Sequence, residues 1–213
     1  MNPVNLCGCR QFAERLPIKA EAVGWGFNRI DWNVYSVGIR YFSRAQFLPY
    51  PIAEWSHMYL IFRLNDGRIV IHEALLSDGW TEKPLEKLLL WRQKSRRNVS
   101  RAHWLPINPF VANLIFSRSS KWVGDRKSYA FAQILAMAAA NTFLGRLLKR
   151  QIKSDDRKVT CSEGAAMLTC DESPFFDPRP NFSFSWDGVT PQNCADKLDQ
   201  IRSQTTLPFP SVF

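Results

Sequence analysis

SHMYLIFRLNDGRIVIHEAL, residues 56–75, is the stretch that decides the fold. The runs 56–64 and 68–75 are both rich in aromatic and branched aliphatic side chains, a composition that favours β-strands. Between them, Asn65-Asp66-Gly67 is a strong short-range signal for a tight turn. We therefore predict two antiparallel strands joined as a hairpin.

The length of the hairpin loop decides which side chain faces His57, because successive residues of a strand point to opposite faces of a sheet. A two-residue loop puts His72 on the face of His57, whereas a three-residue loop puts Glu73 there. Three-residue loops commonly end in a glycine with a left-handed backbone, and Gly67 occupies that position. The turn chemistry favours Glu73, and His72 stays as the alternative.

Shorter elements are predicted on both sides of the hairpin. A strand followed by a helical turn is expected within 34–47, and a second strand at 102–106, closed by Pro106 and Pro109. Helices are expected at 9–16, 80–91, 128–150, 161–168 and 191–198, the last with Thr190 as its N-cap and Pro191 at its first position. Residues 171–187, rich in Pro, Phe and Ser, predict a loop.

The chain has 213 residues, which is enough for one well-buried domain and short for two. A hydrophobic content of 46% with 22% charged residues is typical of a globular fold. Prolines and glycines predict an irregular lead-in at residues 1–30, followed by the domain at 31–202 and a loose tail at 203–213. No stretch approaches the length of a bilayer span, and no secretory signal is expected at the start.

Lysine and arginine outnumber the acidic residues by 28 to 19, which gives a net charge of +9. The basic residues gather at Arg92–Arg101 and at Arg146–Lys158. Such clusters favour either an anionic partner, for example nucleic acid, acidic lipid or another polymer, or a simple solvated face. Because no nucleic-acid-binding motif accompanies the charge, we prefer the solvated face and keep the anionic surface as the alternative.

Five cysteines, at 7, 9, 161, 170 and 194, exclude a complete disulfide framework and indicate a reducing compartment. Cys7 and Cys9 lack the spacing of a zinc knuckle and no second pair follows, so no metal site is predicted. Cys170 and Cys194 lie on the apolar faces of predicted short helices and are expected to be packing residues.

Cys161 stands at the start of a predicted helix, where free N–H groups and the helix dipole stabilise a thiolate. Of only three histidines, His57 opens a predicted strand, and His103 is expected to be structural or on the surface. An imidazole near Cys161 would take the thiol proton, and the backbone N–H of Cys161 would serve as an oxyanion donor. By residue type alone, a packing cysteine and a structural histidine are the commoner occurrences.

Three blocks along the chain carry a family resemblance. They are Trp55-Ser56-His57 with Ile71-His72-Glu73-Ala74 across the hairpin, Cys161-Ser162-Glu163, and Trp186-Asp187-Gly188-Val189-Thr190-Pro191. In this order they resemble the circularly permuted papain-like hydrolases of the NlpC type. The resemblance implies an α+β fold, in which a small antiparallel sheet packs against helices and the nucleophile stands at a helix N-terminus. It also implies Cys161 as nucleophile, His57 as general base and Glu73 as the residue that orients the imidazole.

Some residues depart from the family pattern. Met58-Tyr59-Leu60 lacks the usual glycine after the histidine, and Gly164-Ala165 replaces larger apolar residues. Residues 174–185 form an insert rich in Phe and Pro. These departures leave the candidate catalytic residues in place and bear on the substrate.

The resemblance implies a cysteine amidase or peptidase that works through a thioester, and no cofactor or metal is expected. Peptidoglycan peptides are the commonest substrates of such enzymes, and an anionic cell wall would attract a basic protein. The alternatives are a lipid acyl hydrolase or acyltransferase, related to the lecithin retinol acyltransferase group, and an inactive binding protein that uses its basic face. We expect the protein in the cytoplasm or carried in a phage or virus particle.

Overall fold

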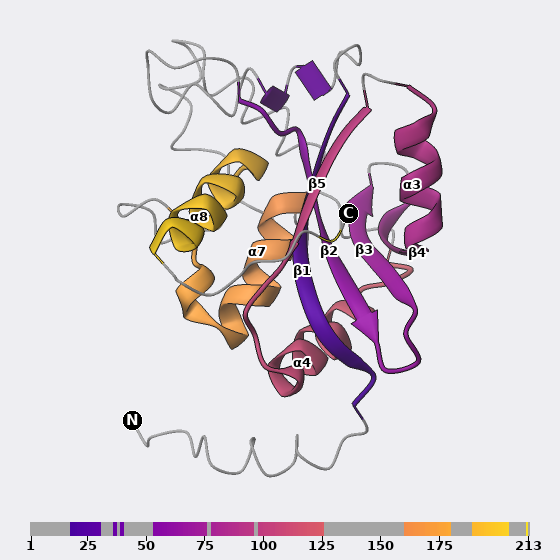
Figure 1. Cartoon of the computed structure of the whole chain (residues 1–213), viewed down its shortest axis with the longest axis vertical. Helices are drawn as coiled ribbons and strands as arrows, with labels where there is room; N and C mark the ends of the chain where they lie inside the picture. Colours follow the sequence, from indigo (N-terminus) through magenta and orange to yellow (C-terminus); the bar gives the residue numbers. More distant parts are fainter. Residues whose placement is uncertain are drawn as a thin grey trace.

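The structure, a computed structural model, describes residues 18–30, 36–37, 39–40, 53–75, 78–95, 98–125, 160–179, 189–204 and 212. Its centre is a five-stranded antiparallel sheet with the strand order β4-β3-β2-β1-β5 (Figure 1). The strands are β1 (Ala20–Ile30), β2 (His57–Leu64), β3 (Ile69–Leu75), β4 (Gly79–Pro84) and β5 (Asn98–Trp104). The helices are α3 (Leu85–Gln93), α4 (Pro109–Ser120), α7 (Cys161–Glu172) and α8 (Pro191–Gln204), with a short 3-10 helix, η2, at Pro174–Phe176. The fold class is therefore α+β, as predicted.

Strands β2 and β3 form the predicted hairpin, and its loop has three residues. Leu64 pairs with Arg68 through a 2.8 Å hydrogen bond from its N–H to the Arg68 carbonyl. Gly67 closes the loop with a φ of 84°, a left-handed conformation that glycine adopts without strain. The register that follows from this loop pairs Leu60 with His72 and Ile61 with Ile71.

Strand β1 overturns part of the predicted lead-in at residues 1–30, because residues 20–30 lie between β2 and β5 within the sheet. Gly24 and Gly26 favoured the prediction of irregular structure here, because glycine weakens a strand. In the fold these glycines permit close approach. A Cβ on Gly24 would lie 2.5 Å from the His103 carbonyl oxygen, and one on Gly26 would lie 2.0 Å from the Tyr59 ring.

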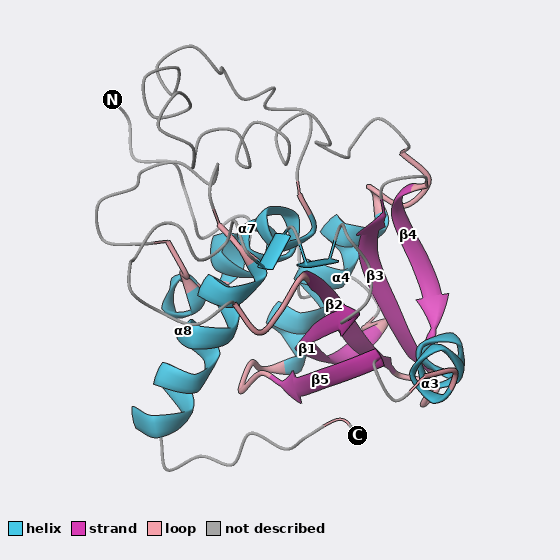
Figure 2. Ribbon diagram, turned by 90° about the horizontal axis from the view of Figure 1, so that it is seen from above, coloured by secondary structure: helices cyan, strands magenta, loops and turns pink. Residues whose placement is uncertain are grey.

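The two faces of the sheet are covered by different helices (Figure 2). Met58, Leu60 and Phe62 of β2 belong to the main core, together with apolar side chains of α4, α7 and α8. Tyr59 and Ile61, which alternate with them, form a smaller cluster with Ile71 on the other face, and leucines of α3 pack against it. By the same alternation His57, the first residue of β2, lies on the face of Tyr59 and Ile61.

Other elements differ from their predicted bounds. The predicted helix at 80–91 is strand β4 followed by α3, and the strand expected at 102–106 is Asn98–Trp104. Helix α4 was not predicted, because Pro109 was interpreted as closing a strand. Pro109 instead begins α4, whose N-cap Asn108 accepts a 2.9 Å bond from the N–H of Val111 through its side chain.

The last helix is longer than predicted, since α8 continues to Gln204 and takes in the first two residues of the expected tail. The predicted helices at 9–16 and 128–150, together with Cys7 and Cys9, lie outside the described residues. Within the described residues, no helix combines the length and the apolar character that crossing a membrane requires.

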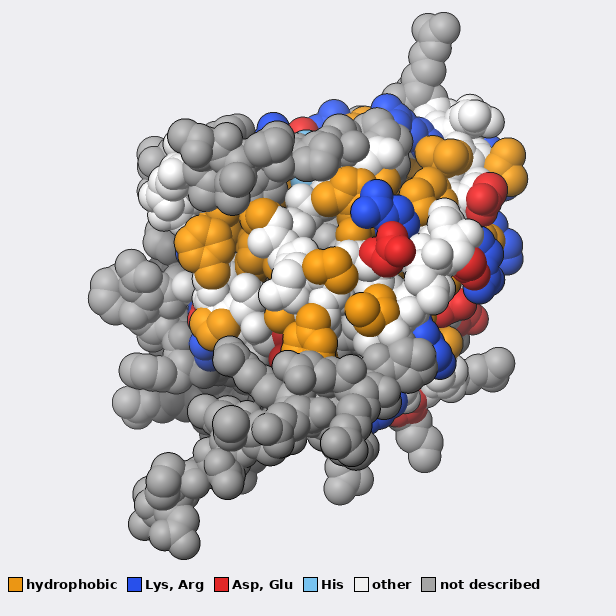
Figure 3. Space-filling model, turned by 60° about the horizontal axis from the view of Figure 1, so that its bottom comes forward, with side chains coloured by type: hydrophobic (Ala, Val, Ile, Leu, Met, Phe, Trp, Pro, Cys, Tyr) orange, Lys and Arg blue, Asp and Glu red, His pale blue; other side chains and the backbone are white. Residues whose placement is uncertain are grey.

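The basic cluster Arg92–Arg101 is only partly described, and Arg146–Lys158 lies outside the described residues. Within the first cluster, Arg101 is ion-paired with Asp199 of α8. Elsewhere Arg118 lies 2.9 Å from Glu172. Figure 3 presents one face, on which basic and acidic side chains of described residues lie side by side. An anionic partner for the basic clusters stays a prediction.

Candidate active site

Cys161 is the first residue of α7, and the helix start is held by a reciprocal pair of hydrogen bonds. The Thr160 hydroxyl accepts from the N–H of Glu163 at 3.3 Å, and the Glu163 carboxylate accepts from the N–H of Thr160 at 3.1 Å. This capping box satisfies donors that the first turn leaves unpaired and so sets where the helix begins. Cys161 is thereby fixed at the positive end of the α7 dipole.

His57 is the first residue of β2, and its position is set by neighbours on both sides. The backbone N–H of Ser56 donates to the Asn28 carbonyl at 3.1 Å, which ties the entry of β2 to β1. The hydroxyl of Ser36 donates to that of Ser56 at 2.6 Å. Tyr59 lies beside the imidazole with ring centroids 6.5 Å apart, and its own hydroxyl is bonded to Ser100.

Glu73 of β3 joins His57 to a lysine. Nε2 of His57 lies 2.8 Å from Oε2 of Glu73, and Nζ of Lys83 donates to Oε1 of the same carboxylate at 2.8 Å. Both oxygens of Glu73 are thus engaged, and its side chain is only 12% exposed. Although burial opposes ionisation, His57 and Lys83 outweigh it and lower the pKa of Glu73 to about 2.

The thiol of Cys161 lies close enough to the imidazole of His57 for each group to shift the pKa of the other. Because Nε2 is engaged by Glu73, Nδ1 is the nitrogen left for the sulfur. Burial lowers the pKa of His57, but Cys161 and Glu73 together raise that pKa to about 10. Burial raises the pKa of the Cys161 thiol, but the positive His57 outweighs it and the net shift is downward.

Two backbone groups add to the stabilisation of the thiolate. The backbone N–H groups of Met58 and Ser162 also lower the pKa of Cys161. The pairing of a thiolate with an imidazolium, oriented by a carboxylate, is the arrangement that activates a cysteine for attack on a carbonyl carbon. Cys161 opens the helix, so its own N–H has no intrahelical acceptor and is suited to an oxyanion.

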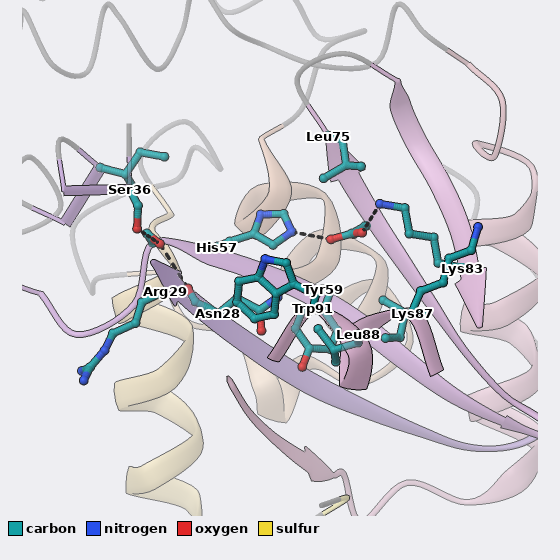
Figure 4. A pocket seen from close by; sticks show the side chains of 14 residues that line it. Asn28, Arg29, Ser36, His57, Tyr59, Leu75, Lys83, Lys87, Leu88 and Trp91 are labelled. Atoms are coloured by element: carbon teal, nitrogen blue, oxygen red, sulfur yellow. Dashed lines mark hydrogen bonds and ion pairs between the residues drawn. The ribbon is translucent and has the colours of Figure 1, made fainter. Parts of the chain in front are cut away.

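A cavity of about 450 Å³ lies on the sheet face that carries His57 and Glu73 (Figure 4). His57 and Glu73 line it, whereas Cys161, which is 4% exposed, does not. Its other lining residues are Asn28, Arg29, Ser36, Ile39, Ser56, Tyr59, Ile71, Leu75, Lys83, Lys87, Leu88 and Trp91. The cavity therefore borders the imidazole and the carboxylate, whereas the buried Cys161 is not part of its lining.

The other histidines lie away from this constellation. His72 is fully buried on the opposite face of the sheet, where Nδ1 is 2.7 Å from the Ser119 hydroxyl and Nε2 is 2.9 Å from Glu82. Burial lowers the pKa of His72 despite the opposing charge of Glu82. His103 is buried at the β5–α8 contact and accepts from Nε of Arg101 at 2.9 Å. His72 is thus not the residue that contacts His57.

Cys170 and Cys194 are buried, and neither touches His57 in the contacts that the structure describes. Burial raises the pKa of the Cys170 thiol to about 12 and that of Cys194 well above its ordinary value. Within the described residues, no group of histidine, cysteine and acidic side chains has the arrangement of a metal site.

Lys83 is the site residue that the sequence analysis missed. It lies on β4, where Ile71 pairs with Lys83 and Glu73 with Thr81, so Lys83 and Glu73 share a face. Thr81, Glu82 and Lys83 are all polar, so no alternation of apolar and polar side chains marks this stretch as a strand. The leucines that follow directly, in α3, led instead to the prediction of one continuous helix at 80–91.

No known protein family, curated protein or solved structure matches this chain.

Proposed function

We propose that this protein is a cysteine hydrolase that cleaves amide bonds through a thioester intermediate, as an amidase or peptidase. The observation that carries the proposal is the position of one imidazole. Nε2 of His57 is bonded to the carboxylate of Glu73, and the ring interacts electrostatically with Cys161 at the start of α7. Cys161 and Glu73 both favour the positively charged imidazolium form of His57, which the reaction needs.

In the proposed reaction the Cys161 thiolate attacks the carbonyl carbon of the substrate. The N–H of Cys161 stabilises the oxyanion, and the His57 imidazolium gives its proton to the leaving amine as the C–N bond breaks. Water then attacks the thioester, with neutral His57 accepting its proton. Cleavage of the C–S bond releases the acid and restores the thiolate. Glu73 holds the ring in position throughout.

We further propose that the fold is the circularly permuted papain-like one. Three features support this reading: the chain order His57, Glu73, Cys161, the nucleophile at a helix N-terminus, and the packing of that helix on a small antiparallel sheet. In papain the cysteine comes first, but the roles of the residues depend on their geometry and not on their order in the chain.

Site-resolved labelling of the cysteines tests the proposal. The protein is treated with a chloroacetamide at neutral pH, and the modified residues are identified by mass spectrometry. Cys161 should react far faster than Cys170 or Cys194, because its pKa is lowered whereas theirs are raised. His57→Asn should remove most of this advantage. Slow, equal labelling of all three would refute a nucleophilic Cys161 and favour a binding protein.

The acyl specificity is tested separately with p-nitrophenyl acetate, short peptide amides and a phospholipid extract. A burst of p-nitrophenol with an acetyl group on Cys161, followed by cleavage of peptide amides, is the expected result. Release of fatty acid from the extract without amide cleavage would contradict the amidase and support the lipid acyl hydrolase. Cys161→Ser serves as the control for each substrate.

A further inference from the structure

The cavity beside His57 borders the imidazole and not the sulfur. In the proposed function, on which this inference rests, the acyl group becomes attached to the sulfur while the leaving amine takes a proton from the imidazole. The leaving amine must therefore lie on the imidazole side of the reacting carbon. A cavity lined by His57 but not by Cys161 is placed for the amine part of the substrate.

The charges around the cavity are unbalanced at one end. Arg29 lies 3.5 Å from Glu54, and Lys83 lies 2.8 Å from Glu73, so both have acidic partners. Lys87, from α3, is exposed at the cavity, and no carboxylate contacts it among the residues that the structure describes. A positive charge is thus available for an anionic group of a ligand.

Asn28 provides a polar group on the β1 side of the same cavity. Its residue is 8% exposed, and its Oδ1 is buried without a hydrogen-bond partner among the described residues. Buried acceptors are rarely left unpaired in folded proteins, so such an atom marks a place where a ligand N–H would be accepted.

The wall between these polar groups is largely apolar. Ile71, Leu88 and Trp91 line it, and Figure 4 shows His57 between Arg29 and Ser36 at one end and the two lysines at the other. A volume of about 450 Å³ lies in the range of small-molecule sites. An apolar side chain of a peptide would pack against this wall. Polar groups of the peptide on either side of that side chain would then face the polar residues of the cavity.

We propose that this cavity is the leaving-group subsite, and that it binds a peptide amine with an apolar residue followed by an acidic one. Asn28 accepts an N–H of the peptide, the apolar wall holds the first side chain, and Lys87 binds the carboxylate of the second. The structure thereby indicates the substrate class on one side of the scissile bond.

The subsite can be tested in the reverse direction, because the site that releases an amine also binds an amine that attacks the acyl-enzyme. Acetyl-Cys161 is formed with p-nitrophenyl acetate. The amine nitrogen of a dipeptide then attacks the thioester carbon. The C–N bond forms, the C–S bond breaks, and the amine proton passes to His57, which restores the thiolate and imidazolium. The acetylated dipeptide is quantified by mass spectrometry.

The two acceptors are leucyl-glutamate α-amide and leucyl-glutaminamide, which differ only in the charge of one side chain. Wild-type protein should transfer acetyl to the acidic acceptor about fivefold faster, the effect of one partly exposed ion pair. Lys87→Gln should abolish this preference. Lys94→Gln, which removes the same charge from the end of α3 but not from the cavity lining, should retain it. Equal transfer to both acceptors by wild type would overturn the proposal.

A binding measurement separates this inference from the proposed function. The same two dipeptides are titrated into Cys161→Ala and followed by NMR, so that no acylation is needed. Tighter binding of the acidic peptide, lost in the Cys161→Ala, Lys87→Gln double variant, supports the subsite. Failure of acetylation together with this binding preference would refute the hydrolase and leave the anionic subsite standing. Equal affinities would refute the subsite.

Discussion

Nε2 of His57 lies 2.8 Å from Oε2 of Glu73, across a hairpin whose loop has three residues. That bond leaves Nδ1 of the ring for the sulfur of Cys161, so the carboxylate decides which nitrogen can exchange a proton with the thiol. Because Glu73 is buried and also bonded to Lys83, the ring is held in one orientation.

Alkylation of Cys161 should remain fast at pH values below the ordinary thiol pKa of 9.0. The charge of His57 outweighs burial and lowers the pKa of Cys161, so its thiolate should persist to a lower pH than that of an ordinary cysteine. The rate should fall only when acid protonates the thiolate. The measurement is the second-order rate of alkylation against pH, resolved by residue. In His57→Asn the thiol is still buried but has no imidazolium beside it, so the midpoint of the alkylation rate against pH should move to higher pH. An unchanged midpoint would contradict the ion pair.

Changes at Glu73 and Lys83 should move the pKa of His57 in opposite directions. Glu73→Gln removes a negative charge that favours the imidazolium, so the midpoint of the His57 titration should fall below about 10. Lys83→Met removes the positive neighbour of Glu73, so the midpoint should rise. The imidazole titration is followed by NMR. Lys83→Arg keeps the charge and should resemble the wild type. Shifts of the same sign in both variants would indicate general structural damage.

Thr160→Ala should destabilise the protein by about 1 kcal/mol, the usual cost of losing an N-cap hydroxyl. It should also slow the alkylation of Cys161, because the Thr160 hydroxyl accepts from the N–H of Glu163 and sets the start of α7. Thr160→Ser preserves that acceptor and is the matched control. Denaturant unfolding and alkylation rates are compared for the three proteins. If the alanine and serine variants behave alike, the cap does not position the sulfur.

Gly26→Ala should destabilise the fold by about 1–3 kcal/mol, the usual cost of overpacking. The added Cβ would lie 2.0 Å from Cε2 of Tyr59, a fully buried ring that lines the cavity beside His57. Tyr59→Leu in the same chain should recover part of the loss by making room. Denaturant unfolding of the two single variants and the double variant measures the coupling. Strict additivity would show that the ring does not confine Gly26.

Local signals predicted the elements that carry the site. The turn at Asn65-Asp66-Gly67 set the hairpin and its three-residue loop, and hence the face that Glu73 shares with His57. The predicted start of a helix at Cys161 matches the start of α7. Such features are readable because a turn or a cap depends on residues adjacent in the chain.

Strand β1, which lies between β2 and β5, could not be predicted in the same way. Its glycines weaken the strand pattern, and the reason for them lies in the backbone of β5 and the ring of Tyr59, which approach from other parts of the chain. Strand β4 was likewise hidden by the leucines after it, and with it Lys83.

By itself, then, the sequence determined a hairpin, the helix start at Cys161 and the residues suited to acyl transfer. Only the tertiary structure decided that the imidazole of His57 is bonded to a carboxylate and interacts with Cys161, and that a cavity with Asn28 and Lys87 adjoins the ring. The reason is physical: a turn or a cap is specified by adjacent residues, whereas these contacts exist only after distant strands and helices have packed together.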